Sequence, residues 1–429
     1  MDRFFLIIEV LGYLFAIYLF SKKKELAIIY LPVIIFSNNI IEPVFSASIY
    51  YGTISFLILY GILRNGTFFK NNIYALVLFC YFFLLLTRSG DLVAIRSNAF
   101  SVFWLFVSIP LIAAIYKKYS ADAIFRELSN SAFLILLLFV ANVLMSTINH
   151  YSPAHMYGIA GGILYGNIYA AGFNILSIAV FIMALQMIMT RKLTYILLVI
   201  LAYSFIMLSL RRTVMLVSSI GILVPMITLL FKKEAKQFIL LGSFIVFAGF
   251  FIYSGTGFGN ELKERYELRQ LNERELENEP RIAEYELIYK DMFVYNAYSP
   301  LIGFGLFNSS GHYGKGVFEL RTLHGDLPSI AHSSGILGVI LYCLMIITVF
   351  KMSLGAASLI IDKSIVFFAA VAFLVFAGTG RFTESGSMLL IFLLLMLPLA
   401  RSNMETQSAI STDNNAINVL HKSPFYKDI

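Results

Sequence analysis

The sequence predicts an all-α membrane protein that crosses the bilayer about 12 or 13 times. Of its 429 residues, 59% are hydrophobic and only 13% are charged, and the mean hydropathy is +0.81. This leaves too few polar side chains to cover a water-soluble globule. Apolar runs of about 17–20 residues recur along the chain, which is the length that a helix needs to cross a ~30 Å hydrocarbon core. The runs are solid, unlike the short alternating segments of a membrane β-barrel.

The predicted spans follow from these apolar runs in chain order. The second one is the weakest, because Pro32 and Asn38 interrupt it, and it is either a span or a re-entrant segment. The first carries Glu9 and lacks a small-residue cleavage site, so we expect a retained span rather than a signal peptide. The thirteen segments are 4–20, 26–41, 44–63, 73–87, 98–115, 131–148, 167–189, 193–210, 213–231, 237–254, 330–350, 364–380 and 386–400.

The domain organisation follows from where the apolar runs stop. Residues 1–254 are predicted to form a transmembrane bundle of about ten helices. Residues 255–329 form one large polar loop, and residues 330–400 return to the membrane. Residues 401–429 are a polar tail, which we expect to be disordered and cytoplasmic. Long loops in such proteins are usually functional rather than simple connections.

Positive charge separates the turns into two alternating sets. The net charge of +7 lies mainly at the ends of apolar runs, so it reflects membrane orientation and not a nucleic-acid partner. By the positive-inside bias the lysine-rich set is cytoplasmic, and the large loop faces the opposite, outer side. The cytoplasmic set holds Lys22, Lys23, Lys24, Arg64, Lys70, Lys117, Lys118, Arg126, Arg191, Lys192, Lys232, Lys233, Lys236, Lys351, Lys363 and Arg401. The short outer turns hold Arg3, Arg88, Arg96, Arg211, Arg212 and Arg381.

The short outer turns contain arginine and no lysine. A guanidinium binds phosphate through two parallel hydrogen bonds and stays charged when it is partly desolvated. The pattern therefore indicates an anionic ligand, such as a lipid-linked phosphate, at the outer membrane surface. The alternative is that these side chains reach out to ordinary lipid headgroups. Cys80 and Cys343 both fall inside predicted spans, which indicates neither a disulfide framework nor a metal site.

Three stretches around the large loop form a pattern that resembles the bacterial O-antigen polymerase and O-antigen ligase superfamily. The likeness covers about residues 205–345, and it departs from the family at Gly325, where a polar residue is usual, and at Pro328. A second histidine, His332, leaves the choice of functional imidazole open. The three stretches are Leu208-Ser209-Leu210-Arg211-Arg212-Thr213; then Pro280-Arg281 with Tyr285 and Ser299-Pro300-Leu301-Ile302-Gly303-Phe304-Gly305; then His324 and Asp326 with Gly335 and Gly338 downstream.

This resemblance implies a C-type glycosyltransferase-like fold in the bacterial inner membrane, with one large periplasmic loop and an active site facing the periplasm. It implies a metal-independent enzyme without a cofactor that acts on undecaprenyl-pyrophosphate-linked oligosaccharide. The implied partners are membrane lipids, a chain-length regulator and other polysaccharide export proteins. An O-antigen polymerase is the leading interpretation. An O-antigen ligase that transfers glycan to lipid A-core, and a lipid-linked oligosaccharide flippase or transporter, are the alternatives. A transporter predicts short loops and charges deep within spans.

Arginine is the predicted ligand of the pyrophosphate. Arg211 and Arg212, together with Arg281, are expected to stabilise the charge of the departing phosphates. The alternatives are that the Arg211–Arg212 pair anchors a helix end, and that Arg281 pairs with Glu277 or Glu284. Arg88 and Arg96 are expected to extend this anion-binding site as substrate-binding residues.

Histidine is the predicted general base, because imidazole can accept a proton near neutral pH. His324 is expected to take the proton of the acceptor sugar hydroxyl. Asp326 is assigned to substrate binding, where it either orients His324 or serves the turn. His332 is assigned to substrate binding, with a structural role as the alternative.

Overall fold

A computed structural model of the protein describes residues 1–151, 165–168, 171–209, 211–230, 267, 280–317, 322–379 and 384–400. It is about 81% helical, and no strand occurs in these residues. Six of the helices are long and apolar enough to cross a membrane, and five shorter apolar helices accompany them. The protein is therefore an all-α membrane protein, as predicted. The predicted span 237–254, the beginning of the large loop, Arg381 and the tail 401–429 lie outside the described residues.

Most predicted spans coincide with helices, although several helices are longer than their apolar runs. Side-chain caps explain two of the longer ones: Asp91 accepts from the amides of Val93 and Ala94, and Ser120 accepts from the amide of Ala123. The helices are α1 (Asp2–Tyr18), α2 (Leu31–Asn39), α3 (Ala47–Arg64), α4 (Ile73–Leu85), α5 (Leu92–Tyr116), α6 (Ala121–Ile148), α7 (Asn174–Thr190), α8 (Leu193–Leu208), α9 (Arg212–Leu230), α12 (Pro280–Phe293), α13 (Asp326–Ala356), α14 (Ile360–Thr379) and α15 (Ser385–Leu395).

The weak second segment is irregular before α2, whereas Pro32 and Asn38, the residues expected to interrupt it, lie within that helix. A π-helical turn η1 (Leu19–Lys23) and a 3-10 helix η2 (Lys24–Tyr30) precede α2, and Pro32 stands in the first turn of α2, where its missing N–H costs nothing. Beyond the end of α2, the carbonyl of Ile40 accepts hydrogen bonds from the side chains of Asn142 and Asn167 at 3.0 and 3.1 Å. These amides replace the water that a membrane interior cannot supply.

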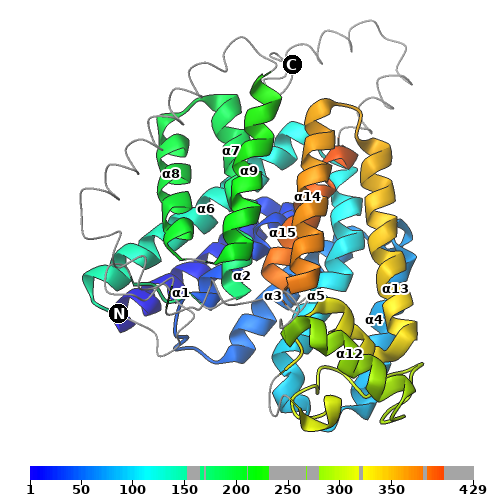
Figure 1. Ribbon diagram of the computed structural model, residues 1–429. Coiled ribbons are helices and arrows are strands. Elements are labelled where there is room, and N and C mark those ends of the chain that lie inside the picture. Colours follow the sequence, from blue (N-terminus) through cyan, green and yellow to red (C-terminus); the bar gives the residue numbers. More distant parts are fainter. Residues whose placement is uncertain are drawn as a thin grey trace, which may run out of the picture.

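Helices α2 and α15 form the centre of the bundle (Figure 1). Every residue of α15 is buried, as is most of α2, and the two helices pack against each other. A helix that is apolar on all sides is buried in a protein core or in a membrane, and α15 packs against α2, α5, α7 and α14. The hydroxyl of Tyr116 in α5 donates to the carbonyl of Leu393 in α15 at 2.9 Å, which ties the centre to the outer helices.

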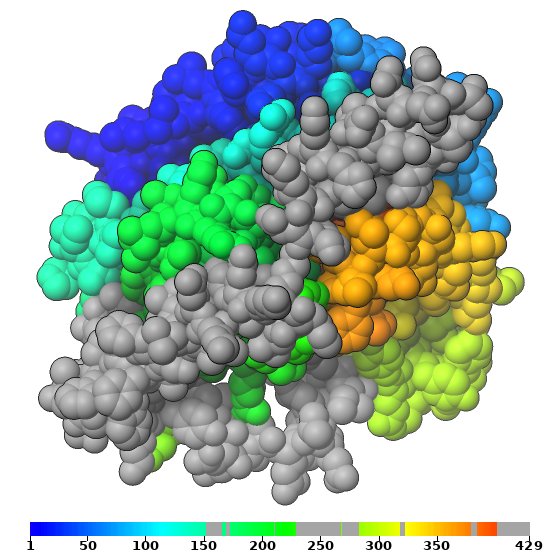
Figure 2. Space-filling view, turned by 90° about the horizontal axis from the view of Figure 1, so that it is seen from above, coloured from blue at the N-terminus to red at the C-terminus, as the bar shows by residue number. Residues whose placement is uncertain are grey.

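The outer helices present apolar side chains outward. Leu14 and Ile17 of α1, Leu84 at the end of α4 and Leu374 of α14 are all more than half exposed. Apolar surface on this scale suits contact with lipid rather than water. Figure 2, seen from above, shows the N-terminal helices in blue along one side of a rounded outline and the yellow and orange helices toward the opposite side.

The helix connections lie at two opposite ends of the bundle. The α7–α8 connection, which carries Lys192, and the α13–α14 connection, which Lys363 follows in the first turn of α14, lie at the upper end in Figure 1. Helix α12, the start of α13 and the start of α9 lie at the lower end. In these examples the two charge classes of turns lie at opposite ends of the molecule, in agreement with the alternation that the sequence predicts.

Candidate functional site

The candidate site is built from α12, the loop that follows it and the first turns of α13. The turn at residues 299–305 docks its backbone directly onto α13. The amide of Phe304 donates to the carbonyl of His332 at 2.7 Å, and the amide of Ile336 donates to the carbonyl of Pro300 at 2.9 Å. These bonds replace those that α13 loses at its kink, where Gly335 leaves helical geometry at φ 65° and ψ −166°. Turn and kink therefore form one interlocked unit.

Glycine is required at this interlock because the two backbones touch. A Cβ added at Gly303, whose φ is +70°, would lie 2.6 Å from the backbone of α13. A Cβ added at Gly335 would lie 2.4 Å from the carbonyl carbon and oxygen of Leu301. Both distances are impossible contacts between a side chain and a rigid backbone. The glycines that carry the family resemblance thus have a structural reason in this chain.

The interlocked turn also reaches α4 and the short helix η4 (Leu86–Arg88) that follows it. A Cβ at Gly305 would lie 3.4 Å from the carbonyl oxygen of Arg88, and the amide of Leu306 donates to the hydroxyl of Ser89 at 3.1 Å. The Tyr81 hydroxyl donates to the carbonyl of Ser334 at 2.8 Å. The structure thus brings the backbone at Arg88 beside the site, while the Arg88 side chain is exposed.

The chemical centre of the site is the pair formed by Glu284 and His324. The Glu284 carboxylate is fully buried, whereas the His324 side chain is 33% exposed. Oε1 of Glu284 lies 3.2 Å from Nδ1 of His324. Oε2 accepts the backbone N–H of His324 at 2.8 Å and that of Gly325 at 3.3 Å. One buried carboxylate on α12 therefore fixes both the backbone and the ring of the predicted general base.

Hydrogen bonding keeps the Glu284 carboxylate charged. Burial alone would raise its pKa, but the bonds from the ring and backbone of His324 and from the amide of Gly325 outweigh it and lower the pKa of Glu284 below its usual value of 4.5. Burial raises the pKa of the neighbouring Tyr285 phenol, and the charges of Asp326 and Glu284 raise it further.

The geometry selects one tautomer of His324. A carboxylate can only accept, so the proton between Nδ1 and Glu284 belongs to the imidazole, and the lone pair is assigned to Nε2. A buried carboxylate that orients an imidazole in this way also stabilises the imidazolium that forms when the ring takes up a proton. The arrangement can therefore act as an oriented general base.

Orienting His324 is one of the two roles that the sequence predicts for Asp326. The carboxylate in contact with the His324 ring is instead Glu284. Asp326 is the first residue of α13 and is buried. Glu284 was considered only as a partner of Arg281. Glu284 lies three residues after Arg281 in the same helix, which marks it as a residue near the candidate site. Its pairing with an imidazole 40 residues away cannot be predicted from local spacing.

His332 lies inside the protein, in the second turn of α13. It is fully buried, and its ring lies 5.1 Å from the ring of Tyr298 and 5.2 Å from that of Phe304. Its Nε2 lies 3.3 Å from the backbone carbonyl of His312. Direct contact of this buried ring with a substrate would need the loop to move, so the surroundings favour the structural alternative.

The predicted arginines occupy different parts of the fold. The guanidinium of Arg211 lies 4.4 Å from the ring centroid of Phe173, and that of Arg96 lies 5.6 Å from the ring centroid of Tyr51. Arg212 is exposed at the start of α9. Arg281 belongs to α12, and its side chain lies outside the described part of the chain.

The start of α9, next to Arg211, and α12 lie at the same end of the bundle (Figure 1). A pyrophosphate clamp made by Arg211, Arg212 and Arg281 stays a prediction. Arg88, Arg96 and Asp326 as substrate-binding residues likewise stay predictions.

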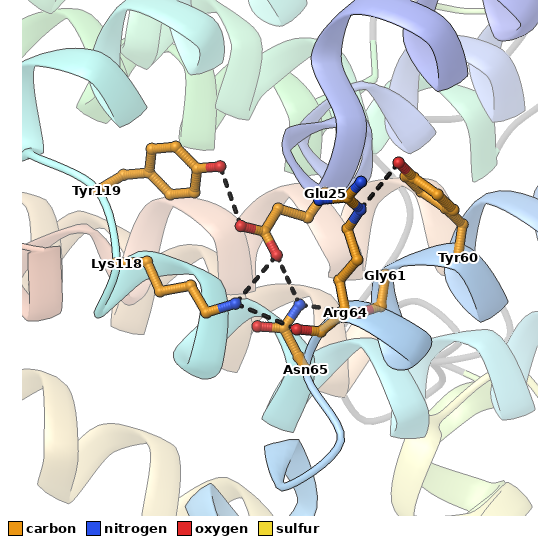
Figure 3. A network of polar contacts seen from close by, with 7 residues as sticks. All are labelled: Glu25, Tyr60, Gly61, Arg64, Asn65, Lys118 and Tyr119. Carbon is orange, nitrogen blue, oxygen red and sulfur yellow. Dashed lines mark hydrogen bonds and ion pairs between the residues drawn. The ribbon is translucent and has the colours of Figure 1, made fainter.

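A second group of buried carboxylates lies among the lysine-bearing turns. Glu25 accepts from Asn65 at 2.9 Å, from Tyr119 at 2.9 Å and from Lys118 at 3.2 Å (Figure 3). Glu127 accepts from Lys23 at 2.9 and 2.8 Å and from the hydroxyl of Tyr30 at 2.5 Å. The sequence analysis missed both carboxylates. In the described residues, no group of three or more His, Cys, Asp or Glu side chains is arranged to hold a metal ion.

No family model matches this chain, and no curated protein is significantly similar to it.

Proposed function

We propose that this protein is a glycosyltransferase of the membrane surface that transfers a glycan from a polyprenyl pyrophosphate to a sugar hydroxyl, and specifically an O-antigen polymerase. The observation that carries the proposal is the partly exposed His324 held through Nδ1 by the buried Glu284. A histidine with only a structural role does not require a buried carboxylate that binds both its ring and its backbone N–H. The resemblance of the surrounding motifs supplies the substrate class.

In the proposed reaction, the acceptor hydroxyl oxygen forms a bond to the anomeric carbon of the donor sugar. The bond between that carbon and the pyrophosphate oxygen breaks, and the polyprenyl pyrophosphate leaves with the bonding electron pair. The hydroxyl proton passes to Nε2 of His324, and Glu284 stabilises the resulting imidazolium. The attacking oxygen thus becomes nucleophilic without a metal.

The departing pyrophosphate gains negative charge, which cationic side chains can stabilise if they are positioned beforehand. Arg281 is the nearest candidate along the chain, since it precedes Glu284 by three residues in α12. Arg211 and Arg212 begin a helix at the same end of the bundle. In this proposal they bind the pyrophosphate while His324 activates the acceptor.

The proposal is tested with purified protein and a defined undecaprenyl-pyrophosphate oligosaccharide. A ladder of lipid-linked products separated by one repeat unit supports the polymerase. Transfer only to added lipid A-core would instead identify a ligase. If no glycan is transferred but the substrate crosses the membrane of reconstituted vesicles, the protein is a transporter and the proposal is wrong.

A further inference from the structure

An apolar groove runs along the outer surface of the bundle between α1 and α3. It encloses about 500 Å³, within the size range of small-ligand pockets. Gly52 lies in its wall, and a Cβ added there would meet nothing within 4 Å. Side chains on both of its walls, among them Ile17 and Phe56, are more than half exposed. Six residues that line it are Tyr13, Ile17, Phe20, Ile49, Gly52 and Phe56.

One end of the groove is aromatic and basic. The ring of Phe20 lies 4.8 Å from the ring of Tyr60 and 5.0 Å from that of Phe56. The Nε of Arg64 donates to the Tyr60 hydroxyl at 2.8 Å, which fixes the guanidinium over this end and uses only one of its five N–H groups. Lys22 follows Phe20 by two residues and is exposed.

The basic charge at this end exceeds what the nearby carboxylates neutralise. Glu25 is matched by Lys118 (Figure 3), and Glu127 is matched by Lys23. Within the part of the chain that the structure describes, no carboxylate lies within ion-pair distance of Arg64 or Lys22. A groove that accepts hydrocarbon thus ends at cations suited to phosphate.

We propose that this groove binds an anionic phospholipid, with one acyl chain between α1 and α3 and the headgroup phosphate at Arg64 and Lys22. The charge at one end selects an anionic over a zwitterionic lipid, and the open wall at Gly52 admits the chain. The site is independent of the proposed glycosyl transfer, because it uses none of the residues of α12 or of the loop before α13.

Native mass spectrometry of the full-length protein in detergent tests the proposal. Phosphatidylglycerol and phosphatidylcholine with the same acyl chains are added separately. We expect about tenfold tighter binding of phosphatidylglycerol, the effect of one or two cations near a headgroup. The double variant Arg64→Gln/Lys22→Gln should abolish this preference. Lys70→Gln is the matched control, because Lys70 is also exposed but lies on η3 (Phe68–Asn71), which packs against α4 and α5.

Gly52 tests the chain-binding part of the groove. Gly52→Phe fills the groove and should remove binding of phosphatidylglycerol, whereas Gly52→Ala should keep it. Should Gly52→Phe fail to fold, the surface variants at Arg64 and Lys22 still decide the headgroup preference. Equal binding of the two lipids by the wild-type protein would overturn the proposal. So would phosphatidylglycerol binding that folded Gly52→Phe leaves unchanged, or tighter binding of undecaprenyl phosphate in the same groove.

Discussion

Two buried carboxylates in this protein are held by three donor groups each, but the donors differ in kind. Glu25 faces the fixed charge of Lys118, an amide and a phenol, whereas Glu284 faces two backbone amides and the imidazole of His324. An ammonium group beside a carboxylate keeps its proton near neutral pH, while an imidazole can gain or lose one. The comparison teaches that burial of a carboxylate does not mark a reactive site; the ability of its partner to titrate does.

The first prediction tests this comparison by removing the imidazole of His324, the partner of Glu284. His324→Ala should lower glycan transfer by about 10²–10⁴-fold, the contribution of a general base, and should lower the unfolding temperature only slightly, because Glu284 keeps its two backbone hydrogen bonds. The product ladder measures the first effect and thermal unfolding in detergent the second. His312→Ala is the control, since this loop histidine is also exposed. An unchanged ladder in His324→Ala would remove His324 from the mechanism.

The second prediction concerns the scaffold beneath the site. Gly335→Ala should destabilise the protein by at least about 3 kcal/mol, because the new methyl group collides with the backbone at Leu301 in addition to the strain of a positive φ. Gly316→Ala is the matched control: its φ is +79°, but no atom lies within 4 Å of the added Cβ. It should show only the backbone strain, about 1 kcal/mol. Equal unfolding temperatures for the two variants would contradict the interlocked turn.

The third prediction concerns the lysine-bearing end. Lys23→Ala leaves the carboxylate of Glu127 buried and without its ammonium partner. We expect a loss of about 3 kcal/mol in stability, the lower end of the range for a broken buried pair, because Tyr30 still donates. Transfer activity per folded molecule should stay unchanged. The exposed neighbour Lys22 gives the control Lys22→Ala; a large loss of activity in folded Lys23→Ala would give this end a catalytic role.

The smallest expected effect is a dependence of the stability of α12 on pH. The pKa of Glu284 is lowered by folding, so its charge stabilises α12 fully above the usual value of 4.5, and this stabilisation is lost as the pH falls through the lower folded value. Hydrogen-exchange protection of α12 amides should therefore decline below about pH 4.5 in the wild-type protein. Glu284→Gln should remove this dependence, whereas Glu286→Gln, at an exposed salt bridge to Lys290, should preserve it.

Much of the fold could be predicted because a helix that crosses a membrane requires a long apolar run in the sequence. The irregular second segment could be predicted only in part, because Pro32 and Asn38 both lie within the regular helix α2 and the irregular turns precede them. The starts of α5 and α6 could not, because polar residues such as Arg96 and Glu127 separate their first turns from the apolar runs. Glu9 lies in a helix, as the sequence predicts, but its hydrogen bonds from the amides of Val44 and Phe45 could not be predicted.

The site could be predicted less completely, for a physical reason. His324 could be predicted because it holds the histidine position in the motif that carries the family resemblance, although His332 leaves the choice open. Its carboxylate partner is Glu284 rather than Asp326, two residues away, because the rigid helix α12 crosses behind the loop. Likewise the glycines at 303 and 335 are separated by 32 residues, so their contact becomes visible only in three dimensions. Contacts between distant segments leave no local pattern in a single sequence.

The central claim, that Glu284 orients His324 for proton transfer, is tested most directly by the pH–rate profile of Glu284→Gln. The measurement uses purified wild-type, Glu284→Gln and Glu286→Gln proteins with an undecaprenyl-pyrophosphate oligosaccharide. We predict that Glu284→Gln lowers the rate by about 10–100-fold across the profile, as expected when an orienting carboxylate is lost. Glu286→Gln should match the wild type. A Glu284→Gln protein that folds and keeps the wild-type rate and profile would contradict the claim.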